Sequence, residues 1–358
     1  MNQKDLSLKK KHQASPVITT IIPTYKRPKS LERAIKSAQE QQINGLLVSV
    51  FDNHSSDETK QVVQSLKRSD SILTYHQHEK NIGAAANFEF GLNAVKTPFF
   101  SILSDDDYLL PGFYKKALDA LDKNPNAMFW AGITLNVDED NNIWDAKVSR
   151  WPREGVFLPP DGIMHIMNGM SPTWTGIVFR QEVLEKIGLP DRETLGPSDL
   201  DFVLKIAAKF PYIVHKHPSA VFTLHTASFS STQPLSSFWP GWKKMFVNIE
   251  EFIADYGDDE RKLAMDTIHA DARRMLFRRG ANAIAQKRND FARDAAEALR
   301  NDYHQVALAN TLLLISSICE NIPVAQKVYS SAYKWAERRI IDRKKEIKTK
   351  YEHLIRQI

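Results

Sequence analysis

Three adjacent carboxylates, Asp105 to Asp107, directly follow the apolar run Phe99 to Leu103. Neighbouring negative charges repel one another unless a cation or a hydrogen-bonding partner neutralises them. Carboxylate oxygens are hard ligands that suit Mg²⁺ or Mn²⁺. A solvated acidic turn is the plain alternative, but the apolar strand expected directly before these residues favours a metal-binding or ligand-binding site.

Three other segments carry candidate acid–base or binding groups. Asp52 follows the apolar run that starts at Leu46, where a carboxylate can accept a hydrogen bond from a ribose or a base. Asp199 and Asp201 follow Ser198, which we interpret as a helix N-cap; each is either a dipole-stabilising residue or a general base at a helix end. His225 ends another expected strand, where a purely structural role is the alternative.

The elements that must position these residues alternate between strand and helix. Continuous apolar, β-branched runs predict buried strands at residues 17–22, 46–51, 72–75 and 99–103. Helical patterns separate them at residues 28–41, 57–66 and 83–95. This alternation predicts an α/β fold with a parallel, doubly wound sheet. The functional side chains are then expected at the carboxyl ends of the strands.

The pattern changes from residue 127 onward. Residues 127–135 and 143–148 flank a polar turn and predict a hairpin, and two short strands are expected at 212–214 and 220–224. Residues 228–237 are rich in Ser and Thr and predict a mobile loop. Beyond Trp239 only helical patterns follow. We therefore expect a disordered basic arm at 1–15, an α/β domain at 16–235 and an all-helical region at 236–358.

Composition narrows the class of protein. The single cysteine, Cys319, rules out an intramolecular disulfide and any zinc site built on several cysteines, which favours a cytoplasmic protein. The net charge is +5, but residues 1–13 carry +3 and residues 327–358 carry +6, which leaves −4 for the rest of the chain. A body of this charge argues against nucleic acid as a partner.

Six motifs in order resemble family 2 glycosyltransferases, which have the Rossmann-like GT-A fold. They are Ile21-Ile22-Pro23-Thr24-Tyr25-Lys26-Arg27, Asp52-Asn53-His54-Ser55-Ser56-Asp57, Asn81-Ile82-Gly83-Ala84-Ala85-Ala86-Asn87, Leu103-Ser104-Asp105-Asp106-Asp107, Gly196-Pro197-Ser198-Asp199-Leu200-Asp201 and Leu224-His225-Thr226-Ala227-Ser228. The resemblance covers residues 17 to about 230, roughly the first two thirds of the chain.

The resemblance implies a role for each matching residue. Asp199 would be the general base, with Asp201 as the fallback. Asp107, the last residue of a DXD-like motif, and His225 would bind the metal, Mn²⁺ or Mg²⁺. The remaining positions would bind the nucleotide sugar: Pro23, Thr24, Tyr25, Asp52, Asn81, Gly83, Asn87, Asp105 and Asp106.

The implied activity is an inverting, metal-dependent transfer of a hexosyl or N-acetylhexosaminyl group. The donor would be a nucleotide-diphosphate sugar, with UDP favoured, and the acceptor a saccharide or lipid-linked saccharide in surface polysaccharide synthesis. Two rivals remain at this stage. A nucleotidyltransferase of similar fold usually has a Gly-rich, basic loop after its first strand, which residues 24–28 lack. A catalytically silent sugar-nucleotide-binding or scaffold protein is the non-enzymatic alternative.

Residues 327–358 predict one long basic helix with an apolar stripe. Packing within the helical region or in a homodimer is the simpler interpretation. Peripheral docking on the cytoplasmic face of an anionic membrane is the second, because Lys and Arg fill the other faces of this helix.

Overall fold

A computed structural model describes residues 16–67, 72–167, 170–225, 233–342 and 345–355. The chain divides into two compact units that interleave along the sequence. The first contains Met1–Gly132, Thr173–Leu189 and His217–Phe222, and the second contains Ile133–Pro172, Pro190–Lys216 and Thr223–Ile358. The expected basic arm at 1–15 lies outside the described residues, and the division of the chain at residue 235 stays a prediction.

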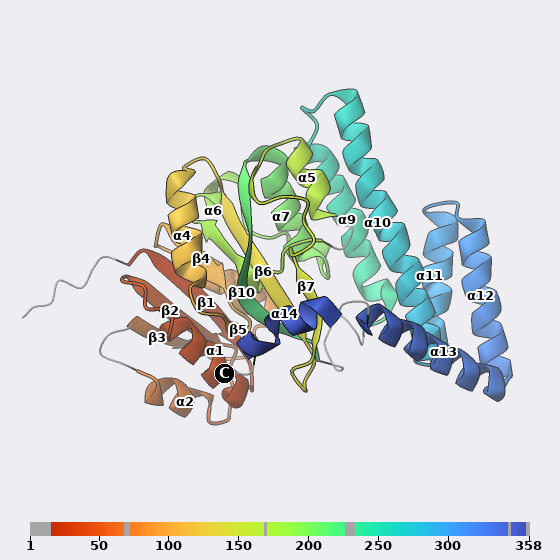
Figure 1. The fold of residues 1–358 in the computed structure, drawn as a ribbon, viewed down its shortest axis with the longest axis horizontal. Helices are drawn as coiled ribbons and strands as arrows, with labels where there is room; N and C mark the ends of the chain where they lie inside the picture. The colour runs from red at the N-terminus through yellow and green to blue at the C-terminus, as the bar shows by residue number, and fades with distance from the viewer. Residues whose placement is uncertain (1–15, 68–71, 168–169, 226–232, 343–344, 356–358) are drawn as a thin grey trace, which may run out of the picture. The chain divides into compact units, whose positions relative to one another are not determined.

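A mixed sheet with helices beside it forms the first unit (Figure 1). Its elements are β1 (Ile18–Thr24), α1 (Pro28–Gln39), β2 (Leu46–Asp52), α2 (Thr59–Ser65), β3 (Ile72–Gln77), α3 (Ala84–Asn93), β4 (Phe99–Ile102), β5 (Tyr108–Leu109), α4 (Phe113–Lys123), the 3₁₀ turn η1 (Trp174–Gly176), β9 (Ile177–Arg180) and α6 (Val183–Lys186). Strand β1 pairs in parallel with β2 and β4, and β2 pairs in parallel with β3. Beyond β4 the sheet becomes antiparallel, since β9 runs opposite to both β4 and β6 (Phe129–Val137).

The parallel core of this unit follows directly from the sequence. Strand β1 lies between β2 and β4, and its Ile18, Ile21 and Ile22 are fully buried. Helix α1 buries Leu31, Ala34, Ile35 and Ala38, the stripe that recurs at helical spacing. The four expected strands and their parallel pairing are therefore confirmed.

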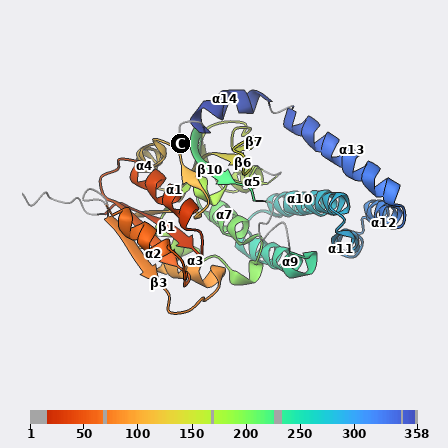
Figure 2. The same cartoon turned by 90° about the horizontal axis from the view of Figure 1, so that it is seen from below.

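The second unit combines short strands with a helical region (Figure 2). It contains β7 (Ile143–Lys147), β8 (Gly155–Phe157), α5 (Asp161–Ile166), the 3₁₀ turn η2 (Arg192–Thr194), α7 (Ser198–Lys209), α9 (Leu235–Phe252), α10 (Asp258–Ala285), α11 (Asn289–Asn301), α12 (Val306–Asn321), α13 (Pro323–Asp342) and α14 (Lys345–Ile355). The hairpin is confirmed, because β7 pairs antiparallel with the second half of β6. The helical C-terminal region is confirmed as well.

Three expectations need correction, and a fourth stays a prediction. The two strands expected at 212–214 and 220–224 are one strand, β10 (Tyr212–Thr223). Ser198 is the first residue of α7 and Pro197 occupies the N-cap position, so Ser198 does not cap the helix. Residues 235–237 of the expected loop belong to α9, while 228–232 lie outside the described residues. Helices α13 and α14 cover most of the expected terminal helix, and its continuity stays a prediction because residues 343–344 lie outside the described residues.

Candidate active site

The carboxyl ends of β1, β2 and β4 meet at one edge of the first unit. Thr24 is the register partner of Asp52, and the Asn53 N–H donates to the Thr24 carbonyl at 2.9 Å. The Leu103 N–H donates to the Ile21 carbonyl at 2.9 Å, which places the acidic segment at the end of β4 beside β1. Parallel pairing of three apolar strands therefore brings together polar side chains from distant parts of the sequence.

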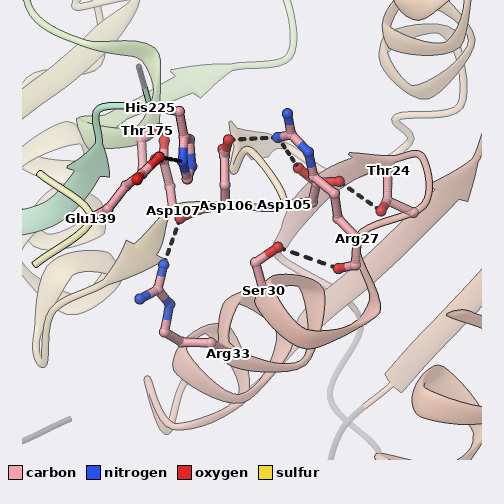
Figure 3. Close-up of polar contacts among 10 residues, drawn as sticks. All are labelled: Thr24, Arg27, Ser30, Arg33, Asp105, Asp106, Asp107, Glu139, Thr175 and His225. Carbon is pink, nitrogen blue, oxygen red and sulfur yellow. Dashed lines mark hydrogen bonds and ion pairs between the residues drawn. The ribbon is translucent and has the colours of Figure 1, made fainter. Parts of the chain in front are cut away.

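The acidic segment is neutralised by hydroxyl and guanidinium donors (Figure 3). Asp105 is buried and accepts hydrogen bonds from the Thr24 hydroxyl at 2.7 Å and from Arg27 at 3.1 Å. Arg27 also lies 2.6 Å from Asp106, and Arg33 donates to the Asp106 carbonyl at 2.7 Å. Burial raises the pKa of Asp105, although the Thr24 and Arg27 contacts act against that shift.

Asp107 is fully buried and accepts a hydrogen bond from the Thr175 hydroxyl at 2.5 Å. No group of three or more Asp, Glu, His or Cys side chains gathers in a metal-holding arrangement within the described ranges. A protein site with one or two carboxylates is nevertheless the usual one for Mg²⁺ at substrate phosphates, because the substrate and water supply the other ligands. Asp107 offers carboxylate oxygens of this kind, and Thr175 donates to one of them in this structure.

Asp52 is fully buried and already accepts three hydrogen bonds. Its Oδ1 accepts from the Ser55 N–H at 2.9 Å, and its Oδ2 accepts from the Tyr75 hydroxyl at 2.5 Å and from Gln77 at 3.1 Å. A carboxylate has about four acceptor positions. The side chain is thus held rigidly, with three of its acceptor positions occupied.

The other candidate nucleotide-binding residues divide by exposure. Tyr25 and Asn81 are exposed, and contacts with Asn81 and Lys26 lower the pKa of Tyr25. Gly83 is also exposed and has φ of +87°, a conformation that favours glycine.

Two of the candidate nucleotide-binding residues are less exposed to solvent. Pro23 is half-buried in β1. Asn87 is buried, donates to the Phe51 carbonyl at 2.9 Å and contacts His78 at 2.9 Å, so it links α3 to β2 and β3.

Asp199 belongs to the second unit, in the first turn of α7. Its carboxylate is solvent-accessible, but the surrounding protein reduces its solvation and thereby raises its pKa. The Leu200 N–H, which donates at 2.8 Å, and the charge of Lys147 both oppose this shift. An accessible carboxylate with a raised pKa is the state that a general base requires.

Asp201, two residues further along α7, has a different environment. It is fully buried, lies 2.7 Å from Lys205 Nζ, and accepts a hydrogen bond from Asn248 at 3.1 Å. Asn248 also donates to Asp191 at 2.9 Å. Asp201 therefore anchors α7 to α9 and to the segment before α7, and is a poor fallback for the base.

His225 lies in the second unit, where its Nδ1 is 3.1 Å from Glu139 Oε1 (Figure 3). The structure thus joins Thr24, Arg27, Asp105 and Asp106 in one network, while Asp199 and His225 have partners of their own in the other unit. Thr175, Arg33, Glu139 and Lys147 were missed by the sequence analysis. Arg27 stands within a quoted motif, but nothing in the sequence indicated that it pairs with two of the aspartates.

Comparison with known proteins finds similarity to glycosyltransferases. Residues 19–188 match the model of glycosyl transferase family 2. A Campylobacter jejuni protein, GalNAc(5)-diNAcBac-PP-undecaprenol beta-1,3-glucosyltransferase, is 41% identical over 99 residues, which are 27% of this chain and 32% of that protein. The match thus spans about a third of that relative's length. An uncharacterized glycosyltransferase of Rickettsia prowazekii is 25% identical over 260 residues, 70% of this chain and 78% of the relative.

Solved structures show the same fold. Residues 1–349 of TarS from S. aureus superpose with a TM-score of 0.59 at 15% identity, covering 89% of this chain and 92% of that TarS fragment. One of the matching TarS structures is a complex with UDP-GlcNAc.

Proposed function

We propose that this chain, residues 19–188 of which match the model of glycosyl transferase family 2, is an inverting, metal-dependent glycosyltransferase that uses a nucleotide-diphosphate sugar. The observation that carries the proposal is the contrast between its carboxylates. Asp105 to Asp107 are tied to cations and hydroxyls, whereas Asp199 is exposed and accepts a hydrogen bond from a backbone N–H. Environments that separate carboxylates in this way assign them different chemical tasks.

In the proposed reaction Asp199 accepts the proton of an acceptor hydroxyl. The hydroxyl oxygen then forms a bond to the anomeric carbon, and the bond from that carbon to the nucleotide diphosphate breaks. A single displacement of this kind inverts the anomeric centre and needs no covalent nucleophile. The leaving group departs with the electron pair of the broken bond.

The metal site is proposed from the family resemblance, together with the oxygen chemistry of Asp107. Asp107, with His225, would hold Mn²⁺ or Mg²⁺ together with oxygens of the diphosphate. The bound cation supplies stabilisation of the negative charge that develops on the leaving diphosphate. Asp105 and Asp106 are assigned to the ribose side, where Arg27 is close enough to balance their charge.

A uridine nucleotide is the proposed donor moiety. Uracil offers one N–H donor, and the Asp52 carboxylate has about four acceptor positions, three of which hold internal hydrogen bonds. Pro23, Thr24 and Tyr25 are proposed to line the base pocket. Asn81, Gly83 and Asn87 are proposed to lie near the nucleotide.

The acceptor is proposed to be a glycan or lipid-linked saccharide in surface polysaccharide synthesis, reached from the cytoplasmic side of the membrane. Support comes from the Campylobacter relative, whose name gives an undecaprenol-linked saccharide as its acceptor. The sugar is proposed to be a hexose or N-acetylhexosamine.

The test measures melting temperature with a panel of nucleotides, each with and without Mn²⁺. A ligand present at a hundred times its Kd adds about 2.7 kcal/mol to stability. We expect UDP to raise the melting temperature only with Mn²⁺, and Asp107→Ala to remove this effect. Asp119→Ala, which alters an exposed aspartate of α4, is the matched control. No shift with any nucleotide would contradict the proposal.

A further inference from the structure

Helix α13 packs on α10 through a polar face. Gln326 Nε2 donates to the Ile284 carbonyl at 2.9 Å, the Tyr329 hydroxyl donates to the Ala281 carbonyl at 3.1 Å, and the Ser330 hydroxyl donates to the Ala285 carbonyl at 2.8 Å. These residues are three and four apart and therefore share one side of the helix. The side of α13 that faces the protein is thus mainly hydrogen-bonding.

The opposite side of α13 is apolar and exposed. Val324, Val328 and Trp335 are 69%, 62% and 59% exposed. At 100° per residue their positions lie within about 40° of one another around the helix. A helix of a globular protein normally turns such a stripe toward the core. Here the stripe, which we call the outer stripe, faces solvent.

Cations flank the outer stripe. Lys327, Lys334 and Arg338 are exposed and lie together along one flank, and none of the three forms an ion pair with another described residue. Arg339 lies on the other flank, with its guanidinium 4.6 Å from the centre of the Trp335 ring. The outer stripe therefore combines exposed aliphatic groups, one exposed indole and uncompensated positive charge.

We infer that the outer stripe of α13 docks on an anionic lipid surface. An amphipathic helix lies in the membrane interface when aliphatic and Trp side chains enter it and flanking Lys and Arg side chains meet anionic headgroups. None of the described helices is long and apolar enough to cross a bilayer, so the contact is a peripheral one. This inference gives the proposed enzyme a membrane-docking surface, and it does not depend on any step of the proposed reaction.

The same charges argue against a second copy as the occupant. In a two-fold symmetric interface the same patch is present on both sides, so it must be complementary to itself. Two outer stripes would bring Lys327, Lys334 and Arg338 toward their own copies, against one acidic position in the stripe, Asp342 at the last residue of α13. Anionic headgroups supply the opposite charge that most of these cations need.

The test is flotation of the full chain with vesicles of phosphatidylcholine alone or mixed with phosphatidylglycerol. We expect binding to the anionic vesicles at low salt, and weaker binding as salt screens the attraction. Val328→Ser with Trp335→Ser is expected to weaken binding roughly a hundredfold through lost apolar burial. Each of Lys327→Ala, Lys334→Ala and Arg338→Ala is expected to weaken it about fivefold. Leu263→Ser, at a residue of α10 that is 59% exposed, is the matched control.

Two results would overturn the inference. One is absence of binding to anionic vesicles at low salt, or binding that the Val328→Ser, Trp335→Ser double variant leaves unchanged. The other is a dimer in light scattering that the same double variant converts to monomer, since a second copy would then cover the outer stripe. The Mn²⁺-dependent effect of UDP on melting temperature is measured on the same variants. It reports on the proposed function separately, and we expect it to be unchanged.

Discussion

Lys205 Nζ lies 2.7 Å from the carboxylate of Asp201, and both side chains are buried on the same face of α7. Asn248 connects this buried pair to half-buried Asp191, so a charged network fixes the first turn of α7. Removing one partner of a buried ion pair is costly because the other charge stays without compensation. The pair therefore holds the turn that carries Asp199.

We expect Asp201→Asn to lower the free energy of unfolding by about 3 kcal/mol, because it leaves the Lys205 charge buried. Sugar transfer at a temperature where the variant is folded should be retained, since Asp201 is a positioning residue. Lys209→Ala is the control, because it removes a more exposed ion pair with Asp255 from the same helix and should cost at most about 1 kcal/mol. Urea unfolding and a transfer assay measure both effects. Loss of transfer in folded Asp201→Asn would assign the base to Asp201.

Asp199→Asn should reduce transfer without destabilising the protein. We expect transfer to fall by about a hundredfold or more while nucleotide binding is retained, because a general base contributes on this order. Its raised pKa gives a second effect with a definite sign. A carboxyl whose pKa is raised on folding stabilises the protein fully below its unfolded pKa, and this contribution is lost as pH rises through the folded pKa.

The Asp199→Asn variant should therefore melt at a higher temperature than the wild type at neutral pH. This difference should disappear below the ordinary pKa of an aspartate, about 3.9. The apparent pKa of the acid limb in the wild-type pH profile of kcat/KM should likewise lie above about 3.9. Melting curves and initial rates measured across pH provide the check. An acid limb at the ordinary value would show that Asp199 is not the ionising base.

Local signals in the sequence predicted the elements, but not the partners that complete the site. Strand β1 was predictable because a buried strand is a continuous apolar run. Helix α1 was predictable because its buried face recurs at helical spacing. Strand β10 was divided in two because its centre, residues 215–218, is not buried, and pairing with β8 and β5 at its ends holds it extended. The bond from Thr24 to Asp105 joins residues 81 positions apart, and sequence spacing carries no signal for such a contact.

Arg27 neutralises both Asp105 and Asp106, so its removal should make the acidic segment depend on other cations. We expect Arg27→Ala to lower the melting temperature at low ionic strength, because adjacent carboxylates then repel one another. Added Mg²⁺ should restore stability in this variant more than it stabilises the wild type. NaCl of equal ionic strength separates specific binding from screening.

The control for this experiment is Lys36→Ala, which removes an exposed ion pair with Glu32 from α1. That pair is worth at most about 1 kcal/mol and has no part in the acidic segment. Equal responses of the two variants to Mg²⁺ would show that Arg27 does not take the place of a cation beside the aspartates.

Gly241 allows α9 to lie against the 3₁₀ turn that precedes α7. A Cβ atom built at Gly241 would lie 2.1 Å from the Thr194 carbonyl oxygen, a backbone atom that cannot rotate away. In a free helix, replacing Gly by Ala stabilises by up to about 1 kcal/mol. Here we expect Gly241→Ala to destabilise by about 2 kcal/mol, because the two backbones must separate.

Gly280→Ala provides the comparison, since its Cβ would meet the Leu312 Cδ1 methyl at 2.8 Å, and a leucine side chain can move. We therefore expect a smaller loss of stability there. Displacement of the turn at Thr194 in Gly241→Ala should also reduce the rate of transfer, because this turn leads into the helix that carries Asp199. UDP binding by the first unit should be unchanged. Urea unfolding, transfer rates and UDP-induced melting shifts test the three parts separately. Equal stability losses in both variants, with transfer intact, would show that the approach of α9 does not position Asp199.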